Sequence, residues 1–209
     1  MKRAGHVLAF WLFLISASIF LVTLLSLIFF PIAAQVENLA RVAGMSAAKL
    51  YHNYVQLMVY LYNPFSGNVV HLADFPVSAS GARHFADVRN LFVFDIVVML
   101  VTAWPALRYL TQLTRQKQRY ELVGQARGGI LVSICLIVAM ALNFDAFFIA
   151  FHKVMFRNND WLFDPATDPI INVLPEDFFA ICFGLGFALF LGVLIWLVIT
   201  GTRDARRTV

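Results

Sequence analysis

The chain has 209 residues, of which 61% are hydrophobic and 13% are charged. An ordinary soluble domain carries about 25% charged residues, so this composition excludes such a domain and predicts a single membrane domain. The formal net charge is +4. Basic residues beside anionic lipid headgroups explain this charge, which gives no reason to expect a nucleic-acid partner.

Four apolar stretches are long enough to cross a membrane. They cover residues 7–31, 91–110, 129–151 and 178–200, and about 20 residues are needed to cross the hydrocarbon core. The first follows Lys2 and Arg3, as a signal peptide would. However, its apolar run exceeds the roughly 7–15 residues of a signal peptide, so we expect a retained helix.

Basic residues are divided unevenly between the two sides of these spans, with ten on the side of the termini and six on the other. The ten are Lys2, Arg3, Arg108, Arg115, Lys117, Arg119, Arg127, Arg203, Arg206 and Arg207, and the six are Arg41, Lys49, Arg83, Arg89, Lys153 and Arg157. Cytoplasmic segments carry the excess of basic residues, so both termini are predicted to be cytoplasmic. Residues 32–90 and 152–177 would then form an outward-facing cap. We therefore expect an all-α membrane protein with four transmembrane helices and an extracytoplasmic cap.

In residues 44–62 of this cap, apolar side chains recur at three- and four-residue steps. They are Leu50, Tyr51, Tyr54, Leu57, Met58 and Leu61, with Lys49, Asn53 and Gln56 opposite. The pattern is typical of an amphipathic helix that lies in the membrane interface. Two interpretations remain open, a simple membrane anchor or a lid over a site at the bilayer surface.

Two histidines stand at the same end of neighbouring spans. His84 precedes the second span and His152 closes the third. Histidine moves protons near neutral pH, so the pair indicates acid–base chemistry at the membrane surface. Asp87 shares a helix face with His84 and is a candidate to orient its ring. The alternative is structural, with Arg83 paired to Asp87 and His152 capping carbonyl groups.

Two aspartates fall within the predicted spans. Asp145 lies seven residues before His152, on the same helix face and about 10 Å away by helical rise. Asp95 lies eleven residues after His84. A carboxylate inside a span is a functional candidate, and both aspartates are candidates to support the histidines. A pairing with Arg89, with another residue in the membrane or with a trapped water is the alternative.

The motifs of several common chemistries are absent from the sequence. There is no G-x-S-x-G, H-E-x-x-H or P-loop, and the spacing of histidines and aspartates gives no support for a metal site. The two cysteines, Cys135 and Cys182, fall in predicted spans. They are interpreted as buried small apolar residues.

Two motifs contain the histidines. The first is His84-Phe85-Ala86-Asp87-Val88-Arg89. The second comprises Phe151-His152, Phe156, Asn158, Trp161-Leu162, Asp164-Pro165, Asp168, Ile170-Ile171, Leu174-Pro175-Glu176 and Phe178-Phe179. Both motifs, and more loosely Tyr54, Leu57 and Tyr60-Leu61, resemble the family of lipoprotein intramolecular transacylases, small four-span membrane proteins of Gram-positive bacteria. Span count, topology and length also agree, so the resemblance covers nearly the whole chain.

The resemblance implies an acyltransferase of the bacterial cell membrane that acts on a diacylglyceryl-modified lipoprotein. The α-amino group of the substrate's N-terminal cysteine attacks the sn-2 ester, which gives an N-acyl, lyso-form lipoprotein. The catalytic histidines map onto His84 and His152. No cofactor is implied, because the ester already carries the acyl group. We expect a monomer among membrane lipids, with the lipoprotein as its partner.

The chemistry of the implied reaction suggests roles for further residues. The attacking α-amino group has a pKa of about 7.7–8.0, so a histidine base is needed to take its proton. An aromatic cleft would hold the cyclic intermediate together. The expected clamp comprises Phe148, Phe151, Phe156, Trp161 and residues of the outer helix. The oxyanion candidates are Asn158, Arg89 and backbone amides.

Two other classes of function remain open. A non-catalytic assembly factor or sensor would tolerate the replacement of His84 and His152. Another extracytoplasmic lipid-active enzyme, such as a phospholipase, would release free fatty acid, whereas a transacylase keeps both acyl chains on one lipoprotein.

Overall fold

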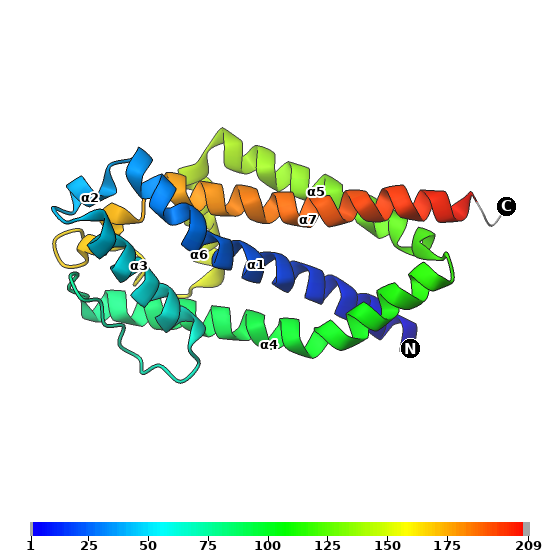
Figure 1. Cartoon of the computed structure of the whole chain (residues 1–209), viewed down its shortest axis with the longest axis horizontal. Coiled ribbons are helices and arrows are strands. Elements are labelled where there is room, and N and C mark those ends of the chain that lie inside the picture. Colours follow the sequence, from blue (N-terminus) through cyan, green and yellow to red (C-terminus); the bar gives the residue numbers. More distant parts are fainter. Residues whose placement is uncertain (1, 207–209) are drawn as a thin grey trace. The chain divides into compact units, whose positions relative to one another are not determined.

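The computed structural model describes residues 2–206, which form helices and, within that range, no β-strand. Four helical segments there are long and apolar enough to cross a membrane. The long helices are α1 (Lys2–Val36), α4 (Ala79–Arg115), α5 (Val123–Leu142) and α7 (Glu176–Ala205) (Figure 1). The predicted all-α class with four spans is confirmed. Arg207, one of the ten basic residues counted above, lies outside the described residues.

Short helices connect the long ones. They are α2 (Leu39–Val42), α3 (Ala47–Tyr62), α6 (Phe144–Met155) and the 3-10 helices η1 (Arg119–Leu122) and η2 (Pro169–Val173).

The third apolar stretch differs from the single span predicted over residues 129–151. Helix α5 ends at Leu142, and α6 begins at Phe144. Between them Asn143 adopts an extended conformation, and its Oδ1 accepts a hydrogen bond from the Ala146 amide at 2.9 Å. This is the geometry of an N-cap, which starts a new helix. Apolar periodicity does not reveal such a break, whereas an Asn followed by an acidic first turn does.

The contacts of the chain divide it into two units. Unit 1 holds the residues up to Val22, Asp95–Leu142 and the residues from Phe183 onward, and unit 2 holds Thr23–Phe94 and Asn143–Cys182. Each unit has its own apolar cluster. Because both histidines of interest belong to unit 2, the candidate site lies within that unit.

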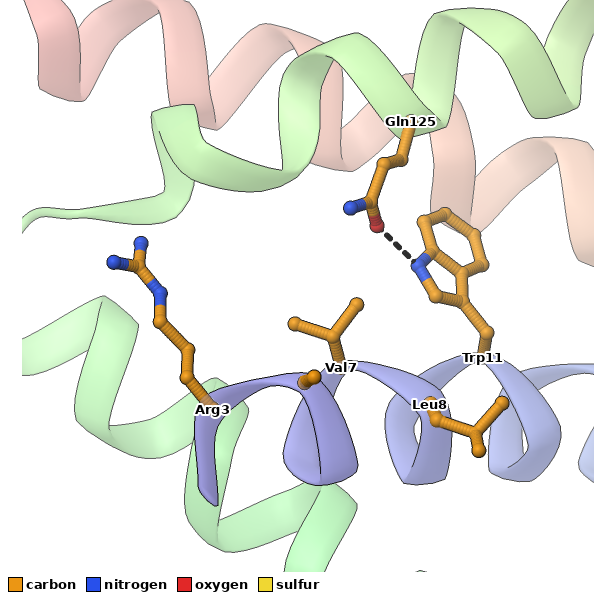
Figure 2. A pocket seen from close by; sticks show the side chains of 6 residues that line it. Arg3, Val7, Leu8, Trp11 and Gln125 are labelled. Carbon is orange, nitrogen blue, oxygen red and sulfur yellow. Dashed lines mark hydrogen bonds between the residues drawn. The ribbon is translucent and has the colours of Figure 1, made fainter. Parts of the chain in front are cut away.

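In unit 1, parts of α1, α4, α5 and α7 pack around Ala126, Leu194 and Leu197, which are fully buried. Both of the free cysteines lie on long helices, but Cys135 is exposed rather than buried as predicted, and Cys182 of unit 2 is half-buried. A pocket lined by Arg3, Ala4, Val7, Leu8, Trp11 and Gln125 is also made by unit 1 (Figure 2). It contains neither histidine of interest.

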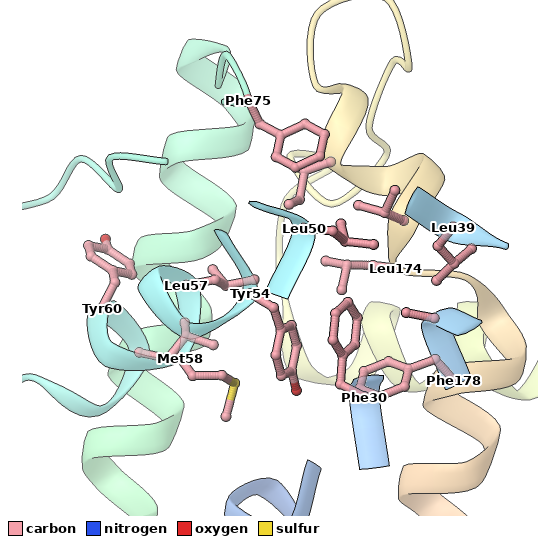
Figure 3. Packing of buried hydrophobic residues seen from close by; sticks show 14 of the residues in the cluster. Phe30, Leu39, Leu50, Tyr54, Leu57, Met58, Tyr60, Phe75, Leu174 and Phe178 are labelled. Atoms are coloured by element: carbon pink, nitrogen blue, oxygen red, sulfur yellow. The ribbon is translucent and has the colours of Figure 1, made fainter. Parts of the chain in front are cut away.

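The cluster of unit 2 is built on aromatic rings. Phe30 of α1 stacks on Tyr54 of α3 with 3.9 Å between ring centroids, and Phe178 of α7 meets both rings edge-on (Figure 3). The Tyr54 hydroxyl also hydrogen-bonds Ser26 Oγ at 2.6 Å. Aromatic pairs of this kind contribute beyond the area that they bury, so these contacts hold α1, α3 and α7 together in unit 2.

Helix α3 is amphipathic, as the periodicity indicates, but its apolar side faces protein. Leu50, Leu57 and Leu61 are buried in the cluster of unit 2. Asn53, expected on the polar side, is completely buried, and it exchanges hydrogen bonds with Asp74. The apolar residues therefore stabilise unit 2, and they are not available to anchor α3 in lipid.

We expect that Tyr54→Ala destabilises the protein. The change removes two ring contacts and one hydrogen bond and leaves a cavity, which together cost about 3–5 kcal/mol. Thermal unfolding of the purified protein in detergent would measure the loss. Val59, which is 61% exposed on the same helix, provides the control. An equal fall in Tm for Val59→Ala would contradict this account of the cluster.

Candidate active site

The structure brings the two predicted histidines together. His84 lies in the second turn of α4 and His152 near the end of α6, and their ring centroids are 5.9 Å apart. Each side chain is only 8% exposed. Residues 68 positions apart in the sequence thus form one buried imidazole pair.

The orientation of His152 is set by its own helix. Its Nδ1 lies 2.8 Å from the Phe148 carbonyl oxygen, one helical turn earlier. Because a carbonyl only accepts, Nδ1 carries the hydrogen and Nε2 holds the lone pair. This contact is the carbonyl capping considered from the sequence, but it leaves Nε2 for chemistry. Burial lowers the pKa of His152 below its ordinary value, which favours the neutral ring.

His84 is enclosed by phenyl rings. Phe156 and Phe163 meet its ring edge-on, with centroid distances of 4.8 and 5.4 Å. Its Nδ1 is buried and has no hydrogen-bond partner among the described residues. Most buried polar atoms are paired, so an unpaired one in a site of this kind is a candidate to bond a bound molecule.

Aromatic side chains also surround His152. Phe148 lies 4.0 Å from it between ring centroids, and Trp161 lies 4.9 Å away at an angle of 32°. Phe151 meets the ring edge-on at 5.5 Å, and Phe156 touches both histidines. The four named aromatic residues of the expected clamp therefore all lie against His152.

Phe163 was not among the residues predicted for the site. From the sequence it belongs only to an irregular loop of aromatics and prolines, and no signal there points to a histidine. In the structure its ring packs against His84 and Phe85. Only the folded path of residues 156–168 brings it to this position.

The loop after α6 is held to α4 by polar contacts. Asn158 donates to the Asp87 carboxylate at 2.9 Å, and Arg83 makes a two-point contact with Asp160 at 2.9 and 2.7 Å. Arg83 therefore pairs with Asp160 and not with Asp87. The hydrogen bonds from Arg83 hold the pKa of the Asp160 carboxyl below its usual range. Asp87 binds the loop, and no hydrogen bond joins it to His84 in the described structure.

Arg89 is engaged away from the histidines. Its guanidinium donates to the carbonyls of Ser66 and Gly67 and lies 5.2 Å from the centroid of the Tyr60 ring. The side chain is buried. Its observed role is to fasten the 63–72 segment to α4.

The two aspartates predicted as supporting residues lie elsewhere. Asp145 is exposed in the first turn of α6, where a carboxylate favours the positive end of the helix. Asp95 belongs to unit 1 and hydrogen-bonds Ser16. Within residues 2–206, no group of three or more His, Cys, Asp or Glu side chains is arranged to hold a metal ion. The chemistry of the described site is therefore that of two imidazoles enclosed by aromatic rings.

A family model described as lipoprotein intramolecular transacylase Lit matches residues 5–179. No match was found among curated proteins. Among solved structures, the lipoprotein intramolecular transacylase Lit from Bacillus cereus is 28% identical, with a TM-score of 0.85 over 100% of this chain and 97% of that chain.

Two further structures of the Bacillus cereus protein carry a substituted histidine. The variant with arginine is 30% identical, with a TM-score of 0.74 over 100% of this chain and 93% of that chain. The variant with alanine is 28% identical, with a TM-score of 0.76 over 100% of this chain and 95% of that chain. Because the family model matches well over half of the residues, the chain belongs to the lipoprotein intramolecular transacylase Lit family.

Proposed function

We propose that this protein moves an acyl chain within a diacylglyceryl-modified lipoprotein, from the sn-2 oxygen to the α-amino group of the N-terminal cysteine. His84 and His152 are the catalytic residues in this proposal. The observation that carries it is the buried imidazole pair, with 5.9 Å between ring centroids, in a chain of this family. Family membership supports the reaction, and the geometry supports the two residues.

His152 is the general base. The α-amino group has a pKa of about 7.7–8.0, so part of it is the neutral amine that can attack, and this amine must lose one proton as the amide forms. With Nδ1 bonded to the Phe148 carbonyl, the lone pair on Nε2 of His152 accepts that proton while nitrogen bonds to the ester carbonyl carbon. Burial keeps the ring neutral and ready to accept it.

The same proton completes the reaction. The bond between the carbonyl carbon and the sn-2 oxygen breaks, and this oxygen needs a proton to leave as a hydroxyl. His84, whose Nδ1 has no partner among the described residues, is placed to pass it on. The amine loses one proton and the sn-2 oxygen gains one, so no water or co-reactant is consumed.

The aromatic rings favour transfer over hydrolysis. Phe148, Phe151, Phe156, Phe163 and Trp161 surround the two imidazoles. They exclude water, and their faces suit acyl chains. Holding the amine against the ester in such a space supplies the proximity that closure of a medium-sized ring requires.

Asn158 and Arg89 fit the oxyanion role less well than the sequence indicates. The Asn158 amide donates to Asp87, and its Oδ1 accepts from the Asp160 amide. Arg89 is occupied by loop carbonyls. We therefore assign both residues to holding the loops of the site, which leaves backbone amides as the remaining candidates for the oxyanion.

We further propose an orientation in the membrane and an oligomeric state for the enzyme. The excess of basic residues beside the termini supports cytoplasmic termini in the cell membrane, with residues 32–90 and 152–177, and so both histidines, facing outward. Both histidines come from one chain, so the site needs no second copy, and this supports a monomer.

We expect His84→Ala and His152→Ala each to lower N-acylation by at least about 100-fold, because each removes a group that carries the proton. Each variant would be expressed at equal level with a reporter lipoprotein in cells that make diacylglyceryl lipoproteins. Fragmentation mass spectrometry of the N-terminal peptide is the measurement, because the diacyl and N-acyl lyso forms share one mass.

The same experiment separates the alternatives. A wild-type protein that leaves the α-amine free would contradict the transacylase. Loss of one acyl chain, with free fatty acid released, would indicate a phospholipase. Full N-acylation by both alanine variants would remove the histidines from the mechanism.

The pH dependence follows from the burial of His152. The substrate amine must be neutral, so kcat/KM already falls below the amine pKa of about 7.7–8.0. It falls more steeply once pH drops below the pKa of His152, which lies under the ordinary value of 6.5, and this steeper part is the acid limb of His152. Trp161→Ala uncovers the ring, which raises the pKa toward its ordinary value and moves the acid limb to higher pH. Trp104, which is 74% exposed on α4, provides the control. An acid limb that stays in place in Trp161→Ala, or moves to lower pH, would refute the role of burial.

A further inference from the structure

Asp168 is a buried carboxylate that the reaction itself does not use. Its side chain is only 1% exposed. Oδ1 accepts a hydrogen bond from the Ser78 amide at 2.7 Å, and Oδ2 accepts one from Thr167 Oγ1 at 3.0 Å. Ser78 immediately precedes α4. Asp168, which is 90 positions from Ser78 in the sequence, thus places its carboxylate at the start of the helix that carries His84.

Gly81, in the first turn of α4, makes this approach possible. A Cβ on Gly81 would overlap Oδ1 of Asp168 and lie 3.0 Å from its Cγ. The carboxylate therefore rests directly against the helix backbone. Any larger residue at position 81 would push the loop and the helix apart.

Capping alone does not explain this arrangement. The Ser78 hydroxyl already accepts from the Gly81 amide at 3.0 Å, as an N-cap side chain does. A second cap needs neither complete burial nor a glycine facing it. What the contact adds is a fixed distance between α4 and the loop that ends at Asp168.

Both residues of the contact, Gly81 and Asp168, are close in sequence to residues of the site. His84 lies three residues after Gly81, one turn along α4. Phe163 lies five residues before Asp168 and packs against His84 with 5.4 Å between ring centroids. After Asp168, Ile170 and Val173 of η2 are buried in the cluster of unit 2, so the carboxylate is attached to rigid structure.

We infer that Asp168 is a positioning residue for the acyl-transfer site. Its contact with Gly81 and Ser78 sets where α4 stands against the 156–168 loop, and so holds His84 against Phe163, Phe156 and His152. The effect on the reaction rests on the proposed function, whereas the effect on the position of the ring does not.

The experiment uses purified full-length protein with a synthetic diacylglyceryl lipopeptide. The variants are Asp168→Ala, Asp168→Asn, Gly81→Ala and the double variant Gly81→Ala with Asp168→Ala. Gly128→Ala is the control, because Gly128 is also helical and a Cβ there meets nothing within 4 Å. Values of kcat and KM are taken per folded molecule, after size-exclusion chromatography and a thermal melt.

We expect Asp168→Ala to lower kcat by about 10- to 100-fold, the range that a small misplacement of catalytic groups costs. KM should change by less than about twofold, because substrate contacts remain. Asp168→Asn should retain more kcat, since its amide oxygen still accepts from Ser78. Gly81→Ala should also lower kcat, but the double variant should be no worse than Asp168→Ala, because the two Asp168 atoms that Cβ meets most closely are gone and only Val77 Cγ1, at 3.3 Å, remains.

A second readout needs no turnover. Ring-proton NMR shifts of labelled histidine report the position of His84 relative to Phe156 and Phe163. They should move in Asp168→Ala and Gly81→Ala but stay in place in Gly128→Ala.

Unchanged kcat per folded molecule, with only Tm or yield reduced, would overturn the inference while leaving the proposed function intact. Independent, additive losses in the double variant would overturn it too. If the wild type makes no N-acyl product, the proposed function fails, and the histidine shifts still decide whether Asp168 positions His84.

Discussion

Burial of two imidazole rings among aromatic side chains is the constraint on which this site depends. An imidazole surrounded by phenyl and indole rings loses hydration, and its charged form is disfavoured. For His152 the Phe148 carbonyl then decides which nitrogen holds the hydrogen. Burial and one backbone contact together favour a neutral His152 ring with its lone pair on Nε2, without a carboxylate bonded to the ring in the described structure.

Most of the polar groups near the histidines serve to hold chain segments in place. Asn158 and Arg83 bind the loop after α6 to α4, and Arg89 fastens the 63–72 segment. Asp168 does the same at the start of α4 from a buried position. A site built from loops needs such fixed points, because misplacing reacting groups by about 1 Å costs rate steeply. Charged and polar side chains of this unit thus fix the chain segments that surround the two imidazole rings.

Prediction from the sequence was strongest where a local rule applies. The four spans and the helix over residues 47–62 follow from apolar length and periodicity. The break at Asn143 and the burial of Asn53 were missed, because each depends on a side-chain hydrogen bond that hydropathy does not contain. For the same reason Asp145 was expected inside a span, whereas it lies in the first turn of a new helix.

The sequence by itself determined the membrane class, the number of spans and the family, because these depend on composition and on motifs contiguous in the chain. It also identified the two histidines as candidates for the site. Tertiary structure alone decided that the histidines meet, that Phe163 joins them, and that Asp168 rests on Gly81. Those contacts join residues 68 to 90 positions apart, or depend on the path of an irregular loop. No local propensity encodes such distances; they arise only when packing fixes the helices and loops of unit 2 against one another.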